Sequence, residues 1–130
     1  MNILRLTLKK HWFDLIKSGV KMEEYREIKD YWIRRLIINR DRISSAEWAE
    51  FCTDLKNPTQ SYRSVEELMK FFGCKFSKYD QIQFFNGAYF SESLPNFMIE
   101  CLGIKISEGK EEWGAEKGVN YFVLKLGKRL

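Results

Sequence analysis

The chain has 130 residues, of which 45% are hydrophobic, 15% aromatic and only two are proline. Such a chain can bury a core without disulfide or metal support, which predicts a single domain over residues 1–130 and argues against disorder. The net charge is +4, and residues 1–43 alone carry eleven Lys and Arg against six Asp and Glu, while the remainder is close to neutral. This basic third favours an anionic partner such as a nucleic acid.

The cysteine content and the hydropathy indicate where the protein works. Three cysteines are widely spaced and form no Cys-x-x-Cys pair, so we expect no disulfide framework and a cytoplasmic location. No apolar run approaches about 18 residues and no signal-peptide pattern is seen, so we expect no membrane contact. His11 is the single histidine and no phosphate-loop motif occurs, so neither a metal nor a cofactor is expected.

The N-terminal residues predict a strand followed by a helix. Residues 2–8 are largely apolar with partial alternation, which is typical of a buried strand. Over residues 10–18 the apolar side chains recur at helical spacing, and Trp12 falls on the apolar side of that helix. Gly19 is typical of the left-handed residue that follows a helix C-terminus.

The next residues predict extended chain and a second helix. Over residues 22–27, strand alternation would place Glu24 and Arg26 on one face. Residues 30–38 then return to helical spacing, with Asp30 as the predicted N-cap.

The acidic segment 44–76 predicts a pair of helices that cover one side of a sheet. Ser44 can cap the first helix, and a break is expected over residues 57–61. Ser64 followed by Glu67 has the spacing of a capping box for the second helix.

The C-terminal half is mostly β. Strands are predicted over residues 81–85, 97–106 and 121–126. Asn86 begins a turn signal, Gly103 marks a bend, and Trp113 lies in a glycine- and charge-rich loop. Strands at both chain ends, with long apolar β runs, predict an α+β domain with a mixed or closed sheet.

Lys21, Glu24 and Arg26 are the densest group of potential site residues. Arginine offers a planar donor fork for a phosphate or a base edge, and lysine a point charge. Glutamate can accept from an amine or act as a general base. The alternative is an ordinary ion pair between Glu24 and Arg26 beside a solvated lysine. Trp113 is a candidate surface for base stacking, or else a lid on the core.

The spacing Gly19-x-Lys21-x-x-Glu24-x-Arg26 after a short helix resembles the signature of the ASCH domain family. Further similarity lies in the leading strand, in Phe84-Phe85-Asn86-Gly87 and in the ending from Glu112 to Gly127. The resemblance covers residues 3–38 and 79–127. It implies a PUA-like mixed β-barrel with flanking helices, in which residues 44–76 are a helical insertion, and a cleft beside the helix-to-strand turn.

The resemblance also implies binding of RNA. Because the motif coincides with the basic third of the chain, we expect RNA or a nucleotide to bind in a cleft lined by Lys21, Glu24, Arg26 and Asn86, with Trp113 as a further ligand contact. One branch of the family hydrolyses N4-acetylcytidine with a lysine of the motif, a threonine three residues later and a glutamate on a distant strand. Lys21 matches that lysine, but Glu24 occupies the threonine position. Glu100 lies on a later predicted strand and is the candidate for that distant glutamate.

Three functions therefore stay open. The first is RNA or nucleotide binding at the motif. The second is an amidohydrolase acting on a modified nucleoside, with Lys21 as nucleophile or base, Glu24 or Glu100 as proton carrier and Arg26 as a clamp. The third is a protein-interaction module that uses the helical segment 44–76.

Overall fold

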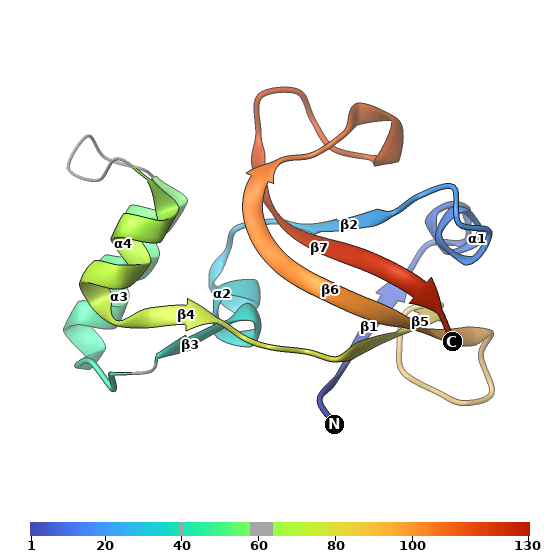
Figure 1. Ribbon diagram of the computed structural model, residues 1–130, viewed down its shortest axis with the longest axis horizontal. Helices are drawn as coiled ribbons and strands as arrows, with labels where there is room; N and C mark the ends of the chain where they lie inside the picture. Colours follow the sequence, from blue (N-terminus) through green and yellow to red (C-terminus); the bar gives the residue numbers. More distant parts are fainter. Residues whose placement is uncertain (40, 58–63) are drawn as a thin grey trace.

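The computed structural model describes residues 1–39, 41–57 and 64–130. A five-stranded sheet curls into a half-barrel at the centre of the fold (Figure 1), with strand order β1-β5-β6-β7-β2. Its strands are β1 (Ile3–Leu8), β2 (Glu23–Arg26), β5 (Gln81–Asn86), β6 (Asn96–Glu108) and β7 (Asn120–Arg129). β1 and β5 are parallel, and the other neighbouring pairs are antiparallel. The predicted α+β class with a mixed sheet is confirmed.

The curl of the sheet is concentrated in the long strand β6. The pairing between β6 and β7 shifts register on both sides of Cys101. Gly103, where a bend was predicted, has a φ of +148°. Such bulges bend a strand and increase its twist, which lets β6 curve around the core.

The helices are α1 (Lys10–Lys17), α2 (Asp30–Leu36), α3 (Ser45–Lys56) and α4 (Val65–Phe72), with a 3-10 turn η1 at Glu111–Trp113. Among the helices of the described residues, none combines the length and the apolar character that crossing a membrane requires. The three cysteines, Cys52, Cys74 and Cys101, are free thiols.

The predicted helix over residues 30–38 is too long. α2 ends at Leu36, and Ile37–Asn39 form strand β3, which pairs antiparallel with β4 (Cys74–Phe76). The helical spacing was misleading because Ile33 and Ile37 are both buried, one from a helix and the other from a strand. A strand partner 37 residues away in the chain overrides the local pattern.

The N-terminus of α2 also differs from the prediction. Lys29 is the N-cap and makes no side-chain capping hydrogen bond, while Asp30 is the first helical residue. The Asp30 carboxylate accepts from Lys56 of α3 at 2.8 Å, and this contact lowers the pKa of Asp30. Asp30 therefore ties α2 to α3 instead of capping its own helix.

The predicted helix pair is present as α3 and α4, which lie together at one end of the molecule beside the small β3-β4 sheet (Figure 1). Ser44 and Glu47 form a capping box at the start of α3. Ser64 accepts from the Glu67 N–H at 3.2 Å, as the capping-box spacing predicts. The segment is not helical to residue 76, since its last residues form β4. The break predicted over residues 57–61 falls outside the described residues, apart from Asn57.

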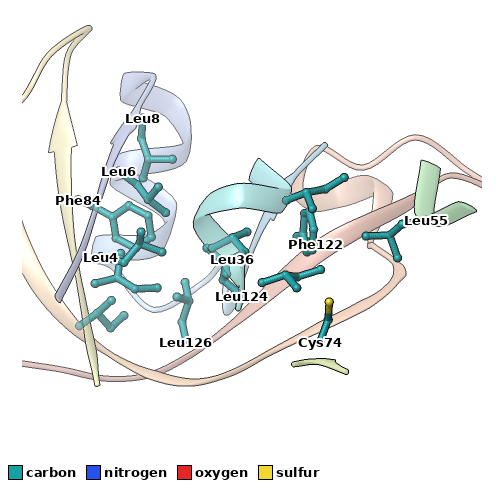
Figure 2. Close-up of a cluster of buried hydrophobic side chains, with 14 of the residues drawn as sticks. Leu4, Leu6, Leu8, Leu36, Leu55, Cys74, Phe84, Phe122, Leu124 and Leu126 are labelled. Atoms are coloured by element: carbon teal, nitrogen blue, oxygen red, sulfur yellow. The ribbon is translucent and has the colours of Figure 1, made fainter. Parts of the chain in front are cut away.

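The helix pair belongs to the same hydrophobic core as the half-barrel. Figure 2 shows Leu55 of α3 and Cys74 of β4 in one cluster with Phe122 and Leu124 of β7. Phe51 of α3 is completely buried in this cluster. α3, α4 and β4 therefore contribute to one core with the half-barrel.

Phe51→Ala tests this integration. Phe51 is 0% exposed, so its truncation should destabilise the whole domain by about 3–5 kcal/mol. Phe71 of α4 is 71% exposed, and Phe71→Ala is the matched control, with an expected loss within about 0.5 kcal/mol. Urea denaturation followed by circular dichroism measures both. Equal stability of the two variants would show that α3 does not share the core.

Candidate functional site

The turn between α1 and β2 positions the motif. Gly19 has a φ of +85°, a left-handed conformation that residues with a side chain rarely adopt. The N–H groups of Val20 and Lys21 both donate to the carbonyl of Leu15 at 3.0 Å, which closes the end of the helix. This local geometry fixes the backbone from which the Lys21 side chain starts.

Glu24 lies between two cations at the centre of the site. Its Oε1 is 2.7 Å from Lys21 Nζ, and its Oε2 is 2.7 Å from an Arg26 nitrogen, Nη2. Lys21 is only 2% exposed and Glu24 6%. The predicted shared face of Glu24 and Arg26 is confirmed, whereas the alternative of a solvated Lys21 is wrong. Buried charges of this kind persist only when each is paired.

Arg26 connects the two edge strands of the half-barrel. Besides Glu24, its Nη2 donates to the carbonyl of Thr7 in β1 at 3.0 Å. The guanidinium carbon lies 4.9 Å from the centre of the Trp32 ring. Its Nε is buried and has no hydrogen-bond partner among the described residues. This nitrogen is thus a buried donor without a partner in the described part of the chain, a kind of group that is rare in folded proteins.

The ion triad of Lys21, Glu24 and Arg26 lines a cleft of about 750 Å³. This volume is within the range of roughly 300–1,000 Å³ that is usual for small-molecule sites. The aromatic residues that line it are Trp12, Tyr25, Trp32, Trp113 and Tyr121. Four cations and three carboxylates also line it: Lys9, Lys21, Arg26 and Lys29 with Glu24, Glu27 and Glu116. The cleft can accommodate flat rings beside anionic groups.

Lys21 is enclosed by aromatic rings as well as by its carboxylate. Its Nζ lies 4.5 Å from the ring centre of Trp12 and 5.6 Å from that of Tyr25. Such cation–π contacts add to the ion pair with Glu24 in holding the Lys21 side chain in place. Trp12 therefore lines the cleft and also packs against the hydrophobic core, as its place on the apolar side of α1 predicts.

Tyr25 fastens the segment between β6 and β7 to the cleft. The Lys110 N–H donates to the Tyr25 hydroxyl at 3.0 Å, and that hydroxyl donates to Glu23 at 2.8 Å. The chain passes so close that a Cβ on Gly109 would lie 2.7 Å from the tyrosine ring. The 3-10 turn that carries Trp113 is held in place by these contacts.

Trp113 is half-buried at the wall of the cleft instead of free in an exposed loop. The Lys110 Nζ lies 4.5 Å from its ring centre. Gly114 follows with a φ of +99°, and a Cβ there would lie 2.9 Å from the Trp12 ring. Glycine thus satisfies both the left-handed turn and the close approach of the two tryptophan-bearing segments.

Asn86 and Glu100 lie outside the group of residues that line the cleft. Asn86 donates from Nδ2 to the Leu8 carbonyl at 3.2 Å and so supports the backbone beside the site. Glu100, on β6, accepts from the Lys128 N–H at 2.7 Å. Of the predicted site residues, the structure brings together Lys21, Glu24, Arg26 and Trp113.

Sequence reasoning missed Thr7 and Trp12 as site residues. Thr7 contributes a backbone carbonyl, which no sequence pattern marks. Trp12 carries a weak signal, because a tryptophan at the head of a short helix beside Lys9 and Lys10 is often only half-buried. Within residues 1–39, 41–57 and 64–130, no cluster of His, Cys, Asp and Glu could hold a metal ion.

Glu24→Gln tests the central ion pairs. The change keeps the shape of the side chain but leaves Lys21 and Arg26 as two neighbouring cations without their carboxylate, so we expect a loss of about 3–5 kcal/mol in urea denaturation. The control is Asp14→Asn, which breaks the exposed Lys10–Asp14 pair on α1 and should cost about 0.5 kcal/mol or less. Equal denaturation midpoints for both variants would contradict the buried triad.

Tyr25 gives the site a pH dependence. Burial, reinforced by the hydrogen bond to Glu23 and opposed by the one from Lys110, raises the pKa of Tyr25 from 10.0 to about 12. The unfolded chain should release this proton first, so stability is complete below pH 10 and falls as the pH rises toward 12. The difference in phenolate absorbance between wild type and Tyr25→Phe measures this titration. A difference curve centred near pH 10 would contradict the assignment.

Comparisons with family models, with curated proteins and with solved structures gave no match for this chain. The chemistry of the cleft therefore rests on its own residues, which are a buried ion triad and a set of aromatic walls.

Proposed function

We propose that the cleft binds RNA or a nucleotide, and that the chain is an ASCH-type domain with a PUA-like fold. The observation that carries this proposal is the ion triad of buried Lys21 and Glu24 with partly buried Arg26, which lies in a cleft lined by the rings of Trp12, Trp32 and Trp113. Aromatic rings stack on nucleobases of any sequence, while fixed cations pair with phosphates or with base acceptors. The half-barrel and the cleft beside the helix-to-strand turn agree with what the family resemblance implies.

The pairing within the triad supports binding more than hydrolysis. Both oxygens of Glu24 already accept from cations, and Lys21 donates to Glu24 beneath the Trp12 ring. A general base or a nucleophile needs a lone pair that can reach the substrate. The second carboxylate of the hydrolase scheme, Glu100, accepts from the backbone of β7 outside the cleft-lining residues. An amidohydrolase would have to break this pairing in every turnover.

The interaction-module alternative has less support. Phe51 and Leu55 of α3 are buried in the core shared with the half-barrel. These side chains are therefore not available to bind a partner protein. The free thiols fit the reducing cytoplasm that we expect for an RNA-binding protein.

Trp113→Ala tests the proposal. If a base stacks on Trp113, its removal should weaken binding of a labelled single-stranded RNA by roughly 5- to 150-fold, since one stacked base contributes about 1–3 kcal/mol. Trp113→Phe should retain most of the affinity because it keeps a ring. Fluorescence anisotropy at several salt concentrations measures the affinities, which should fall as salt rises.

The matched control is Trp48→Ala, because Trp48 lies in α3 outside the cleft-lining residues. Its affinity should equal that of the wild type, with thermal melting to confirm that each variant is folded. Absence of RNA and nucleotide binding at low salt, or equal affinity of the two alanine variants, would refute the proposal. Release of cytidine from N4-acetylcytidine that is lost in Lys21→Arg would establish the hydrolase alternative instead.

A further inference from the structure

A second, smaller cleft of about 380 Å³ adjoins the first. The two clefts meet along a common wall, because four residues line both: Thr7, Arg26, Trp32 and Ala88. The second cleft extends from this wall between β1, α2 and the segment that follows β5. The two clefts are therefore neighbours, and a ligand seated in the first lies beside the second.

The charge of the second cleft differs from that of the first. Its described lining residues include Arg5, Arg26 and Arg35 but neither aspartate nor glutamate. Arg26 is paired with Glu24. Arg5 and Arg35 are therefore the two cations of this cleft that no described lining carboxylate neutralises. The first cleft, in contrast, contains three carboxylates. A surplus of arginine without acids selects for an anion, and phosphate oxygens match the donor fork of a guanidinium.

Arg35 is already held in position for such a contact. Its Nη1 donates to the Tyr31 hydroxyl at 3.1 Å, and its Nη2 donates to the Arg5 carbonyl at 3.5 Å. The guanidinium carbon lies 5.7 Å from the Tyr31 ring centre and 5.5 Å from that of Trp32. A guanidinium fixed by rings and a carbonyl loses little side-chain entropy when it binds a ligand.

Exposed aromatic rings surround these arginines. Tyr31 is 56% exposed, Tyr89 63% and Phe90 48%, and all three line the second cleft. Aromatic rings beside arginines form the kind of surface on which successive bases stack while the backbone follows the positive charge. A single nucleotide in the first cleft would leave this surface unused.

We infer that the ligand is a single-stranded nucleic acid with at least two consecutive nucleotides across the two clefts. One base occupies the first cleft, and the adjoining phosphate and base occupy the second, against Arg35 and Tyr89. This inference rests on the proposed function, because the first cleft must bind a nucleotide. It adds that the physiological ligand is a chain and not a free mononucleotide or nucleoside.

The experiment compares two classes of probe on the full chain. Nucleoside 5′-monophosphates are titrated by tryptophan fluorescence, and a labelled single-stranded RNA of about eight nucleotides by anisotropy. The wild type should bind the RNA at least about tenfold more tightly than the best mononucleotide, because stacking of a second base alone contributes roughly 5- to 150-fold. RNA no tighter than mononucleotide would overturn the chain inference and leave the proposed function intact.

Variants of the second cleft locate the effect. Arg35→Gln should weaken RNA binding and reduce its salt slope by about 1, and it should weaken the binding of RNA more than that of a mononucleotide, because only the RNA places a second base in the second cleft. The matched control is Arg34→Gln, which removes the same charge from the neighbouring position of α2, outside the second cleft. Tyr89→Ala should weaken RNA binding, and Tyr89→Phe should preserve it.

Two results separate failure of the inference from failure of the proposed function. If mononucleotides bind but Arg35→Gln and Arg34→Gln have the same RNA affinity, the second cleft does not hold the chain and the inference is wrong. If neither mononucleotide nor RNA binds the folded wild type at low salt, the proposed function is wrong and the inference falls with it.

Discussion

The carboxylate of Glu24 is the group on which the cleft depends. It holds Lys21 on one oxygen and Arg26 on the other, and Lys21 could not stay buried beside a second cation without it. Through Arg26 the same pairing reaches the Thr7 carbonyl, so it links β2 to β1 across the open side of the half-barrel. One carboxylate thus holds the two cations of the cleft and, through Arg26, helps to hold β1 and β2 together.

Around this charged floor, the walls are built from rings whose positions are set by backbone contacts. Tyr25 holds the segment after β6 through the Lys110 N–H, and that segment presents Trp113. Gly114 allows it to approach Trp12 on α1. Because backbone groups make these connections, the aromatic wall is preorganised before any ligand arrives, which lowers the entropy lost on binding. The second cleft continues the same construction with arginines that rest on Tyr31 and Trp32.

The helical segment contributes from a distance by stabilising α2. Its buried residues Phe51 and Leu55 extend the core, and Lys56 pairs with Asp30 at the start of α2. α2 in turn carries Trp32 and Arg35, which line the two clefts. The segment therefore supports the site through packing, although none of its described residues lines either cleft.

The local sequence determined those features that depend on backbone period and turn chemistry. The end of α1 at Gly19 and the shared face of Glu24 and Arg26 follow from residues within a few positions of each other. The long-range contacts were decided by the tertiary structure alone. The approach of Trp12 to Gly114 and the β3-β4 pairing join segments far apart in the chain. The positions of Asn86 and Glu100 outside the cleft-lining residues likewise follow from the packing of the strands. Periodicity tells which side of an element is apolar, but only packing decides whether that side meets the core, another strand or an open cleft.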